Sequence, residues 1–436
     1  MKASAVSWLG PLPDHWRLER AKWLFRKMDR AVSDTDDVIT CFRDGVVTLR
    51  RNRRTRGFTE SLQEIGYQGI KRGDLVIHAM DAFAGAVGVA DADGKGTGVY
   101  SVCEPKPNAD PNYYKYVVRE MARSGWILAL AKGIRERSTD FRFATFATQL
   151  VPLPPIEEQR SIARFLDDAD RRIQRTIRAK QRLIALLSEH KQGVIHSVVT
   201  HGLDTSVRLK PSGVDWIGHV PERWEVRRLK TLCNMKSGDG ITGDSIEPVG
   251  TYPVYGGNGI RGYAESWTHS GEYVLIGRQG ALCGNVHLVS GESWVSEHAV
   301  VASPHRMHDI RWFAALLTSM NLNQYSVAAA QPGLAVERIM NLRVPVPPAD
   351  EQRRIAERIT GDTADLDRAT RAVEREAALL REYRTQLIAD VVTGKLDVRD
   401  AAARLPDEAD GPEPFDGINI EESGDAEIDA LEAGEV

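Results

Sequence analysis

Apolar residues recur at helical spacing in two long stretches of the chain, residues 151–204 and 344–397, with charged residues on the other faces. Alternating steps of four and three residues are typical of a heptad seam, so each stretch is predicted to form a long amphipathic helix. In the first stretch the expected seam is Ile162, Leu166, Ala169, Ile173, Thr176, Lys180, Leu183, Leu187, His190 and Val194. In the second stretch it is Ile355, Ile359, Asp362, Leu366, Ala369, Val373, Glu376, Leu380, Tyr383 and Leu387.

Prolines stand at the beginning of both stretches and cannot lie inside a helix, so they mark where each helix begins. A helix of about 44 residues is roughly 66 Å long at about 1.5 Å per residue, which is too long and too one-sided to be stable alone. The other stretch is the expected partner. The alternative is that each helix packs only on its own globular domain.

The two stretches are copies of one another. VPLPPIEEQRSIA at 151–163 matches VPVPPADEQRRIA 193 positions later, and VVTHGLD at 198–204 matches VVTGKLD at 391–397. A second motif, WLGPLPDHWRL at 8–18, matches WIGHVPERWEV at an offset of 208. The chain therefore divides into two halves, each with a tryptophan motif, a globular domain and a long helix.

The two globular domains differ in sequence, and both predict a mixture of strands and helices. Glycine and aspartate bound short β-like runs at 44–49, 74–78, 273–276, 285–289 and 299–302, and helices are expected at 113–131 and 312–322. The predicted fold class is α+β, with a pseudo-two-fold internal repeat. The predicted layout is a first domain at 1–150, a helix at 151–205, a second domain at 206–343, a helix at 344–397 and a tail at 398–436.

The charge is unevenly distributed along the chain. Residues 1–400 carry 56 Lys and Arg against 49 Asp and Glu, whereas residues 401–436 carry one Arg against 12 acids. The acidic tail has few residues to bury and is predicted to be disordered. It reads as a solubilising end or, alternatively, as a mimic of DNA charge or a docking segment.

Composition also indicates a compartment. The N-terminal residues lack the apolar core of a signal peptide, and the longest apolar run, 126–131, is too short to cross a bilayer. Cys41, Cys103, Cys233 and Cys283 are isolated and form no CxxC pair, which is typical of reduced cysteines. These features predict a cytoplasmic protein.

Two kinds of segment are candidates for nucleic-acid contact. Arg50, Arg51, Arg53, Arg54 and Arg56 fall within seven residues, a cluster whose repulsion requires a polyanion or nearby carboxylates. The alternative is a solvated loop. The glycine-rich turns at 255–261 and 277–280 carry Tyr, Asn, Arg and Gln, side chains that can contact base edges, although they also suit ordinary hairpins. The GxGxxG pattern at 238–243 is followed by turn formers and is predicted to be a loop rather than a dinucleotide site.

Common catalytic motifs are missing. The sequence has no P-loop, HExxH or GxSxG motif, and its eleven histidines are scattered without zinc-ligand spacing. We therefore expect no catalytic residues, no metal site and no cofactor bound by this chain.

With both VPxPPxxEQRxIA helix starts, both tryptophan motifs and the YPVYGGNGIRGY and GRQG segments in view, the chain resembles the specificity subunit of a type I restriction–modification enzyme. The resemblance extends over residues 8–397. It implies two target-recognition domains held apart by an antiparallel pair of helices, each domain reading one half of a bipartite DNA site. It also implies docking of two modification (methyltransferase) subunits and two restriction subunits, with S-adenosylmethionine, ATP and Mg²⁺ bound in those partners.

The resemblance favours DNA contact over the alternatives for the arginine cluster and the glycine-rich turns. The expected DNA-binding residues are Arg50, Arg51, Arg53, Arg54, Arg56, Lys71, Arg142, Lys236, Tyr255, Asn258, Arg261, Arg278 and Gln279. Two other functions are compatible with the sequence. One is a coiled-coil adaptor presenting two protein-binding domains, and the other is a stand-alone enzyme that cuts or methylates DNA.

Overall fold

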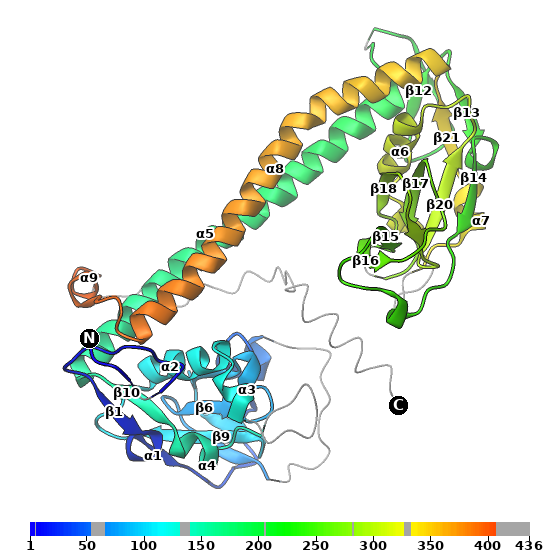
Figure 1. The fold of residues 1–436 in the computed structure, drawn as a ribbon. Coiled ribbons are helices and arrows are strands. Elements are labelled where there is room, and N and C mark those ends of the chain that lie inside the picture. The colour runs from blue at the N-terminus through cyan, green and yellow to red at the C-terminus, as the bar shows by residue number, and fades with distance from the viewer. Residues whose placement is uncertain are drawn as a thin grey trace. The chain divides into compact units, whose positions relative to one another are not determined.

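The computed structural model describes residues 1–4, 6–53, 66–130, 140–204, 206–280, 283–326 and 333–406. They form two compact units, the first made of 1–175 with the segment from 380 onward, and the second of 176–379. Each unit therefore combines one domain with parts of both long helices (Figure 1). The acidic tail is predicted to be disordered from position 398, but residues 398–406 are described and include helix α9 Arg399–Ala403, so the prediction is wrong for this part. The rest of the tail, from position 407, lies outside the described residues.

The first unit is built on a four-stranded antiparallel sheet in the order β2-β9-β6-β7, covered by helix α2. Its strands are β1 Arg17–Arg20, β2 Phe25–Lys27, β3 Ile39–Cys41, β4 Val47–Leu49, β5 Gln68–Ile70, β6 Leu75–His78, β7 Val87–Val89, β8 Gly94–Gly96, β9 Tyr100–Pro105 and β10 Leu150–Leu153. Its domain helices are α1 Ala21–Leu24, α2 Pro111–Arg123, α3 Trp126–Leu130 and α4 Phe143–Thr148. The single helix expected at 113–131 is thus two helices, because Gly125 between them adopts a positive φ of 76°.

The second unit contains a four-stranded antiparallel sheet in the order β14-β20-β17-β18 and a three-stranded sheet in the order β16-β15-β19. Its strands are β11 Leu209–Pro211, β12 His219–Pro221, β13 Glu225–Arg228, β14 Cys233–Ser237, β15 Tyr252–Gly256, β16 Gly259–Ala264, β17 Glu272–Gly277, β18 Val286–Ser290, β19 Trp294–Val295, β20 Ala299–Pro304 and β21 Arg343–Val346. Its domain helices are α6 Ile310–Ser319 and α7 Val336–Met340. Residues 238–242 form no helix and are followed only by a single 3₁₀ turn at Gly243–Ser245, so the loop predicted for the GxGxxG pattern is confirmed.

Alternation along the strands explains why the larger sheet of the second unit is buried on both faces. On β17, Val274 and Ile276 join the core that includes α6 and the long helices. The intervening Tyr273 and Leu275 join a separate cluster with Val289 and Val295. Successive side chains of a strand point to opposite faces, so one apolar run supplies two packing layers.

The long helices α5 Ile156–His201 and α8 Ala349–Val392 run antiparallel, side by side (Figure 1). In the second unit Lys180 pairs with Glu376, and Lys191 Nζ lies 2.6 Å from Asp367, so the numbers rise in α5 as they fall in α8. In the first unit Arg384 of α8 pairs with Asp170 of α5. The predicted fold class, two mixed domains with two long antiparallel helices and an internal repeat, is confirmed.

The seam that buries these helices differs from the predicted one by one residue in several turns. The predicted positions Thr176, Leu183, His190, Glu376 and Tyr383 are exposed. Buried side chains lie instead at Ile177, Ile195, Thr363 and Ala377, with Ile184 and Arg384 partly buried. Strict alternation of four and three has a period of 3.5 residues, whereas an α-helix turns every 3.6, so extra steps of four are needed to follow the contact line.

Each domain is joined to its long helix by the same local structure, which we call the joint. The first joint consists of Trp16, Glu158, Gln159 and Gly394, and the second of Trp224, Glu351, Gln352 and Gly202. Trp16 Nε1 donates to Glu158 at 3.0 Å, and Trp224 Nε1 donates to Glu351 at 3.0 Å. In each joint, therefore, the tryptophan motif supplies the donor and the Glu of the PPxxEQ motif supplies the acceptor of the same hydrogen bond.

The glutamine of each joint ties the helix start to a helix of the domain. Gln159 Oε1 accepts from the backbone N–H of Asp110, the N-cap of α2, while its Nε2 donates to the Pro154 carbonyl at 2.9 Å. Gln352 Oε1 accepts from Asp309, the N-cap of α6, and its Nε2 donates to the Pro347 carbonyl at 2.9 Å. Both glutamines are at most 1% exposed, so these bonds satisfy buried groups that would otherwise be costly.

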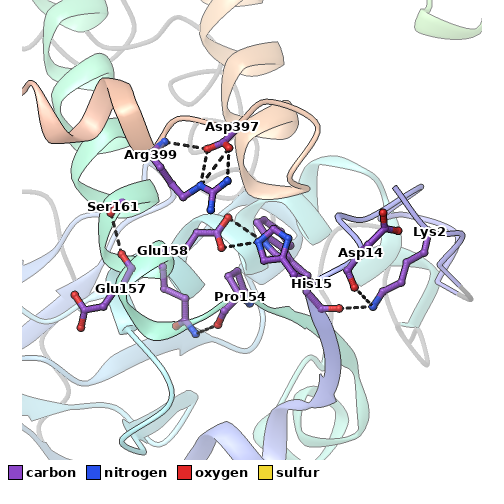
Figure 2. A network of polar contacts seen from close by, with 11 residues as sticks. Lys2, Asp14, His15, Pro154, Glu157, Glu158, Ser161, Asp397 and Arg399 are labelled. Atoms are coloured by element: carbon purple, nitrogen blue, oxygen red, sulfur yellow. Dashed lines mark hydrogen bonds and ion pairs between the residues drawn. The ribbon is translucent and has the colours of Figure 1, made fainter.

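The glutamate of each joint has a second partner, and this partner differs between the two joints. In the first, His15 Nε2 lies 2.9 Å from Glu158, and the Asp397–Arg399 pair lies beside it (Figure 2). In the second, Arg223 Nη2 lies 2.9 Å from Glu351. The Arg399 guanidinium lowers the pKa of Asp397 to about 2.

A left-handed glycine from the end of the opposite long helix closes each joint. Gly394, which follows α8, has a φ of 74° and lies so close to Trp16 and Pro13 that a Cβ atom would be 2.6 Å from the proline ring. Gly202, which follows α5, has a φ of 79°, and a Cβ atom there would be 3.0 Å from Trp224. The first joint therefore includes the end of α8, and the second includes the end of α5.

Candidate nucleic-acid interface

The second domain brings several of the predicted contact residues together where strands β15 and β16 turn. Gly259 at this turn has a φ of 104°, a conformation that favours glycine. The turn also packs closely on its neighbours, since a Cβ atom at Gly257 would lie 2.8 Å from the Gln279 carbonyl oxygen and 3.2 Å from that of His298. Glycines here allow the β15–β16 turn and the turn after β17 to form one group.

Polar side chains of this group bond to one another in pairs. Asn285 Nδ2 donates to Asn258 Oδ1 at 3.0 Å, and His298 Nδ1 lies 2.7 Å from Gln279 Oε1. Arg278 Nη1 donates to Ser237 Oγ at 3.0 Å. We call Ser237, Asn258, Arg278, Gln279, Asn285 and His298 the polar cluster.

The polar cluster retains capacity for external hydrogen bonds. Asn258 and Gln279 are exposed, and each uses only its amide oxygen in the pairs above. Each amide group also carries an NH₂ that can donate to a base edge in the major groove. The oxygen-to-partner bonds hold both side chains in place, which lowers the entropy lost when a ligand binds.

The remaining predicted residues of this domain have different surroundings. Arg261 is exposed on β16, with its alkyl chain over Gly256, where a Cβ atom would be 2.4 Å from Arg261 Cδ. Lys236 is exposed on β14, directly before Ser237, so the two side chains point to opposite faces of the strand. Tyr255 is partly buried against the second core cluster, and this burial raises the pKa of its hydroxyl.

In the first domain, carboxylates lie beside the arginine cluster. The chain leaves β4 through a 3₁₀ turn at Arg50–Asn52. Arg51 Nη1 lies 2.9 Å from Asp37, and Arg53 pairs with Asp44 while stacking over the Phe42 ring at 4.7 Å.

Of the cluster's other members, Arg50 Nε donates to Thr40 at 3.4 Å, and Arg54 and Arg56 lie outside the described residues. Burial alone would raise the pKa of Asp44, but the hydrogen bond and charge of Arg53, the Val46 N–H and the charge of Arg119 together outweigh that effect, and the pKa is lowered.

Lys71 and Arg142 are not joined to the arginine turn by any contact among the described residues. The Lys71 side chain is exposed in the turn between β5 and β6, where its backbone N–H donates to Asp74 at 2.8 Å. Arg142 lies at the start of α4, with Nε 2.6 Å from Asp140. Of the predicted residues, the structure therefore brings Asn258, Arg278 and Gln279 together in the polar cluster. The other predicted residues that the structure describes lie outside this cluster.

Sequence reasoning missed three members of the polar cluster, namely Ser237, Asn285 and His298. They lie 41, 27 and 19 positions from their partners Arg278, Asn258 and Gln279. No local motif marks them, because their proximity depends on the strand order of the sheet. A search for polar residues at the ends of adjacent predicted strands is the one signal that could have found Asn285.

Within the described parts of the chain, no group of three or more His, Cys, Asp or Glu residues could hold a metal ion. No described helix is both long and apolar enough to cross a membrane.

Comparisons with known proteins agree with the fold. Residues 221–374 match the family described as Type I restriction modification DNA specificity domain. A chain from a study of complex assembly and conformational transition of the type I R-M system aligns over 88% of this chain and 100% of its own length, with 17% identity and a TM-score of 0.60. At that identity the likeness shows a shared fold.

Relatives by sequence carry related names. The EcoprrI specificity subunit of Escherichia coli, a type I restriction enzyme component, is 46% identical over 134 residues, 30% of this chain and 33% of its own length. The MjaVIII specificity subunit of Methanocaldococcus jannaschii is 24% identical over 57% of this chain and 62% of its own length. The putative MjaX specificity subunit of the same organism is 22% identical over 90% of this chain and 96% of its own length. The chain thus spans less than two thirds of the first two relatives.

Proposed function

We propose that the chain, whose residues 221–374 match the type I restriction modification DNA specificity domain family, is the DNA-specificity subunit of a type I restriction–modification complex. Each of its two domains would read one half of a bipartite DNA site. The observation that carries this proposal is that one repeated frame, with the same joint in each half, holds two unlike domains. A frame of this kind suits two readers that must recognise different sequences.

The proposed partners are double-stranded DNA, two modification (methyltransferase) subunits and two restriction subunits. We propose that S-adenosylmethionine, ATP and Mg²⁺ bind in those subunits and that this chain contributes recognition without catalysis. The proposed location is the cytoplasm. The relatives named as specificity subunits support this assignment.

We propose that the two domains contact DNA differently. In the second domain, Asn258 and Gln279 would donate their amide N–H groups to base edges, with Arg261, Arg278 and Lys236 beside them. In the first, the arginine turn would exchange Asp37 and Asp44 for phosphate oxygens, since guanidinium groups bind both anions with similar geometry. Lys71 and Arg142 would add phosphate contacts elsewhere on that domain.

Methylome sequencing of cells that express the chain with its modification partner tests the proposal. The expected result is modified adenines within a bipartite motif. Asn258→Ala with Gln279→Ala should relax one half of that motif and leave the other half unchanged. Arg51→Ala is the matched control, because loss of a phosphate contact should lower modification evenly across sequences. A contiguous motif, or no modification at all with a folded complex, would refute the assignment.

One observation favours a second function, that of an adaptor presenting two protein-binding domains. Arg51 and Arg53 are already paired with carboxylates, so the arginine cluster does not by itself require a polyanion. Titration of the assembled complex with duplex DNA separates the two functions. Each phosphate contact of a DNA reader should contribute a slope of about −0.9 in log affinity against log salt, whereas an adaptor would show no binding.

A further inference from the structure

A second group of cations in the first unit is carried by elements other than the arginine turn. Strand β1, helix α1 and strand β2 carry Arg17, Arg20, Lys22, Arg26 and Lys27 within eleven residues that contain a single acid, Glu19. All five cations are exposed. In the described parts of the chain, only Arg26 among them pairs with a carboxylate, that of Glu104. We call these five residues, with Trp23 and Lys106, the cationic surface.

Trp23 stands exposed beside two lysines of this surface. Its side chain is 60% exposed, and the ammonium groups of Lys22 and Lys106 lie 5.2 and 5.7 Å from its ring centroid. Lys106 Nζ also donates to the Lys22 carbonyl at 3.0 Å, which holds it beside the ring. An exposed tryptophan flanked by cations suits a ligand that combines negative charge with apolar or aromatic groups.

The second half of the chain lacks this combination. At the repeat offset of 208, Lys22 corresponds to Lys230 but Trp23 corresponds to Thr231. Arg17 corresponds to Glu225, which reverses the charge. The cationic surface is therefore not a requirement of the repeated frame, since the other half builds its joint without it.

The chain itself contains a segment of complementary chemistry. Residues 407–436 carry 12 Asp and Glu and no Lys or Arg, with Phe415, Ile418 and Ile420 among the acids. The described chain leads into this segment from the same unit, because Arg164 Nη2 of α5 donates to the Leu405 carbonyl and, at 3.3 Å, to that of Pro406.

The distances allow the segment to reach the cationic surface. Arg17 pairs with Leu153, three residues before α5 begins, and Arg164 lies eight residues into α5, about 12 Å along its axis. A chain of 30 residues spans about 30 Å on average when it has no fixed structure. Because the segment is tethered, its effective concentration at the surface would be on the order of millimolar, so a weak contact suffices for occupancy.

We propose that residues 407–436 dock on the cationic surface of the first unit, with the acids against its lysines and arginines and an apolar side chain of the segment against Trp23. This docking does not depend on the proposed function. Its consequence does: if the chain reads DNA, the segment competes with phosphates for this unit and weakens non-specific binding.

A labelled peptide of residues 407–436 tests the docking directly. It is titrated by fluorescence anisotropy onto the chain ending at Pro406, with no DNA present. We expect saturable binding that weakens with salt. Arg20→Glu with Lys27→Glu should weaken it at least tenfold, and Trp23→Thr, which copies the second half, should weaken it at least threefold. The matched control, Arg228→Glu with Lys230→Glu in the second unit, should leave peptide affinity unchanged.

Several results would overturn the docking. One is the absence of peptide binding to a chain whose melting temperature matches the full-length protein. Another is an equal loss in the control and the test variants, which would indicate non-specific attraction. Since no DNA is present, either result leaves the proposed function untouched.

DNA is the other candidate occupant of the surface, and a second titration distinguishes it. Non-specific duplex DNA should bind the chain ending at Pro406 at least threefold more tightly than the full chain, and the Arg20→Glu, Lys27→Glu variant should abolish that difference. If removal of the segment has no effect while the variant weakens DNA binding to both chains, the surface is a DNA contact and the docking proposal is wrong.

Discussion

The two joints share their hydrogen-bond geometry and differ in the residues around it. Trp16 and Trp224 donate to Glu158 and Glu351 at the same distance, 3.0 Å. The second partner of the glutamate is His15 in one joint and Arg223 in the other. A duplicated sequence keeps the contacts that set how a helix leaves its domain, while positions that only add a favourable charge vary.

The domains beyond the joints have diverged much further. The first domain surrounds its arginines with carboxylates, whereas the second gathers amides and glycine turns. Both domains are nevertheless attached through a buried glutamine and an aspartate N-cap. The contrast shows which part of each half is frame and which part is variable surface.

Replacing the joint tryptophans should have the largest effect on stability. Trp16 and Trp224 are at most 1% exposed, so Trp16→Ala and Trp224→Ala should each lower the free energy of unfolding by about 3–5 kcal/mol. Urea unfolding with hydrogen exchange would assign each loss to its unit. If one replacement cost less than about 1 kcal/mol, the two joints would not be equivalent.

Replacing the joint glutamines should have a smaller effect. Gln159→Leu and Gln352→Leu leave the part-buried N–H of Asp110 or Asp309 without its partner and should cost about 2–3 kcal/mol each. Gln→Glu at the same positions keeps the acceptor and removes the donors, which separates the two contributions. Equal stability of the Leu and wild-type chains would contradict the role assigned to these side chains.

Replacing the closing glycines, Gly394 and Gly202, by alanine should destabilise the two joints to different extents. Both have positive φ, which costs about 1–2 kcal/mol for alanine. A Cβ atom at Gly394 would also lie 2.6 Å from Pro13, compared with 3.0 Å from Trp224 for Gly202. We expect Gly394→Ala to destabilise the first unit more than Gly202→Ala destabilises the second, measured by the shift in each thermal transition. The reverse order would mean that the proline moves aside.

The smallest expected effect is a pH dependence confined to the second joint. Burial lowers the pKa of His308, whose Nδ1 lies 3.1 Å from Gln352 Nε2, so the folded state favours the neutral ring. The unfolded chain takes up the proton first as pH falls below about 6.5, and stability conferred above that pH is lost. His308→Asn should flatten this part of the stability profile between pH 7 and 5, and an unchanged profile would exclude His308 as its source.

Much of the frame could be predicted from the sequence, because its signals are local and repeated. The helix starts follow from the PPxxEQ motifs, and β6, β17 and β20 overlap the strands expected from apolar runs. The exact seam could not be predicted, since the extra steps of four depend on how two particular helices pack.

The candidate interface was only partly predictable. Glycine turns pointed to Asn258, Arg278 and Gln279, and the structure brings these together. Their partners Asn285 and His298 required the sheet order, and the pairing of Arg51 and Arg53 with Asp37 and Asp44 required the folded loop. A pattern of local preferences carries no information on contacts between residues that are distant in sequence.

Each joint is closed by a glycine from the end of the other long helix, and this also governs the order in which the chain can fold on the ribosome. The second unit is continuous in sequence and is complete once residue 379 has emerged, whereas the first waits for the end of α8 to supply Gly394. The N-terminal half is therefore translated first and finished last. Nascent chains halted between residues 379 and 394 would combine a complete second unit with an open first joint, a state that chaperones or proteases could recognise.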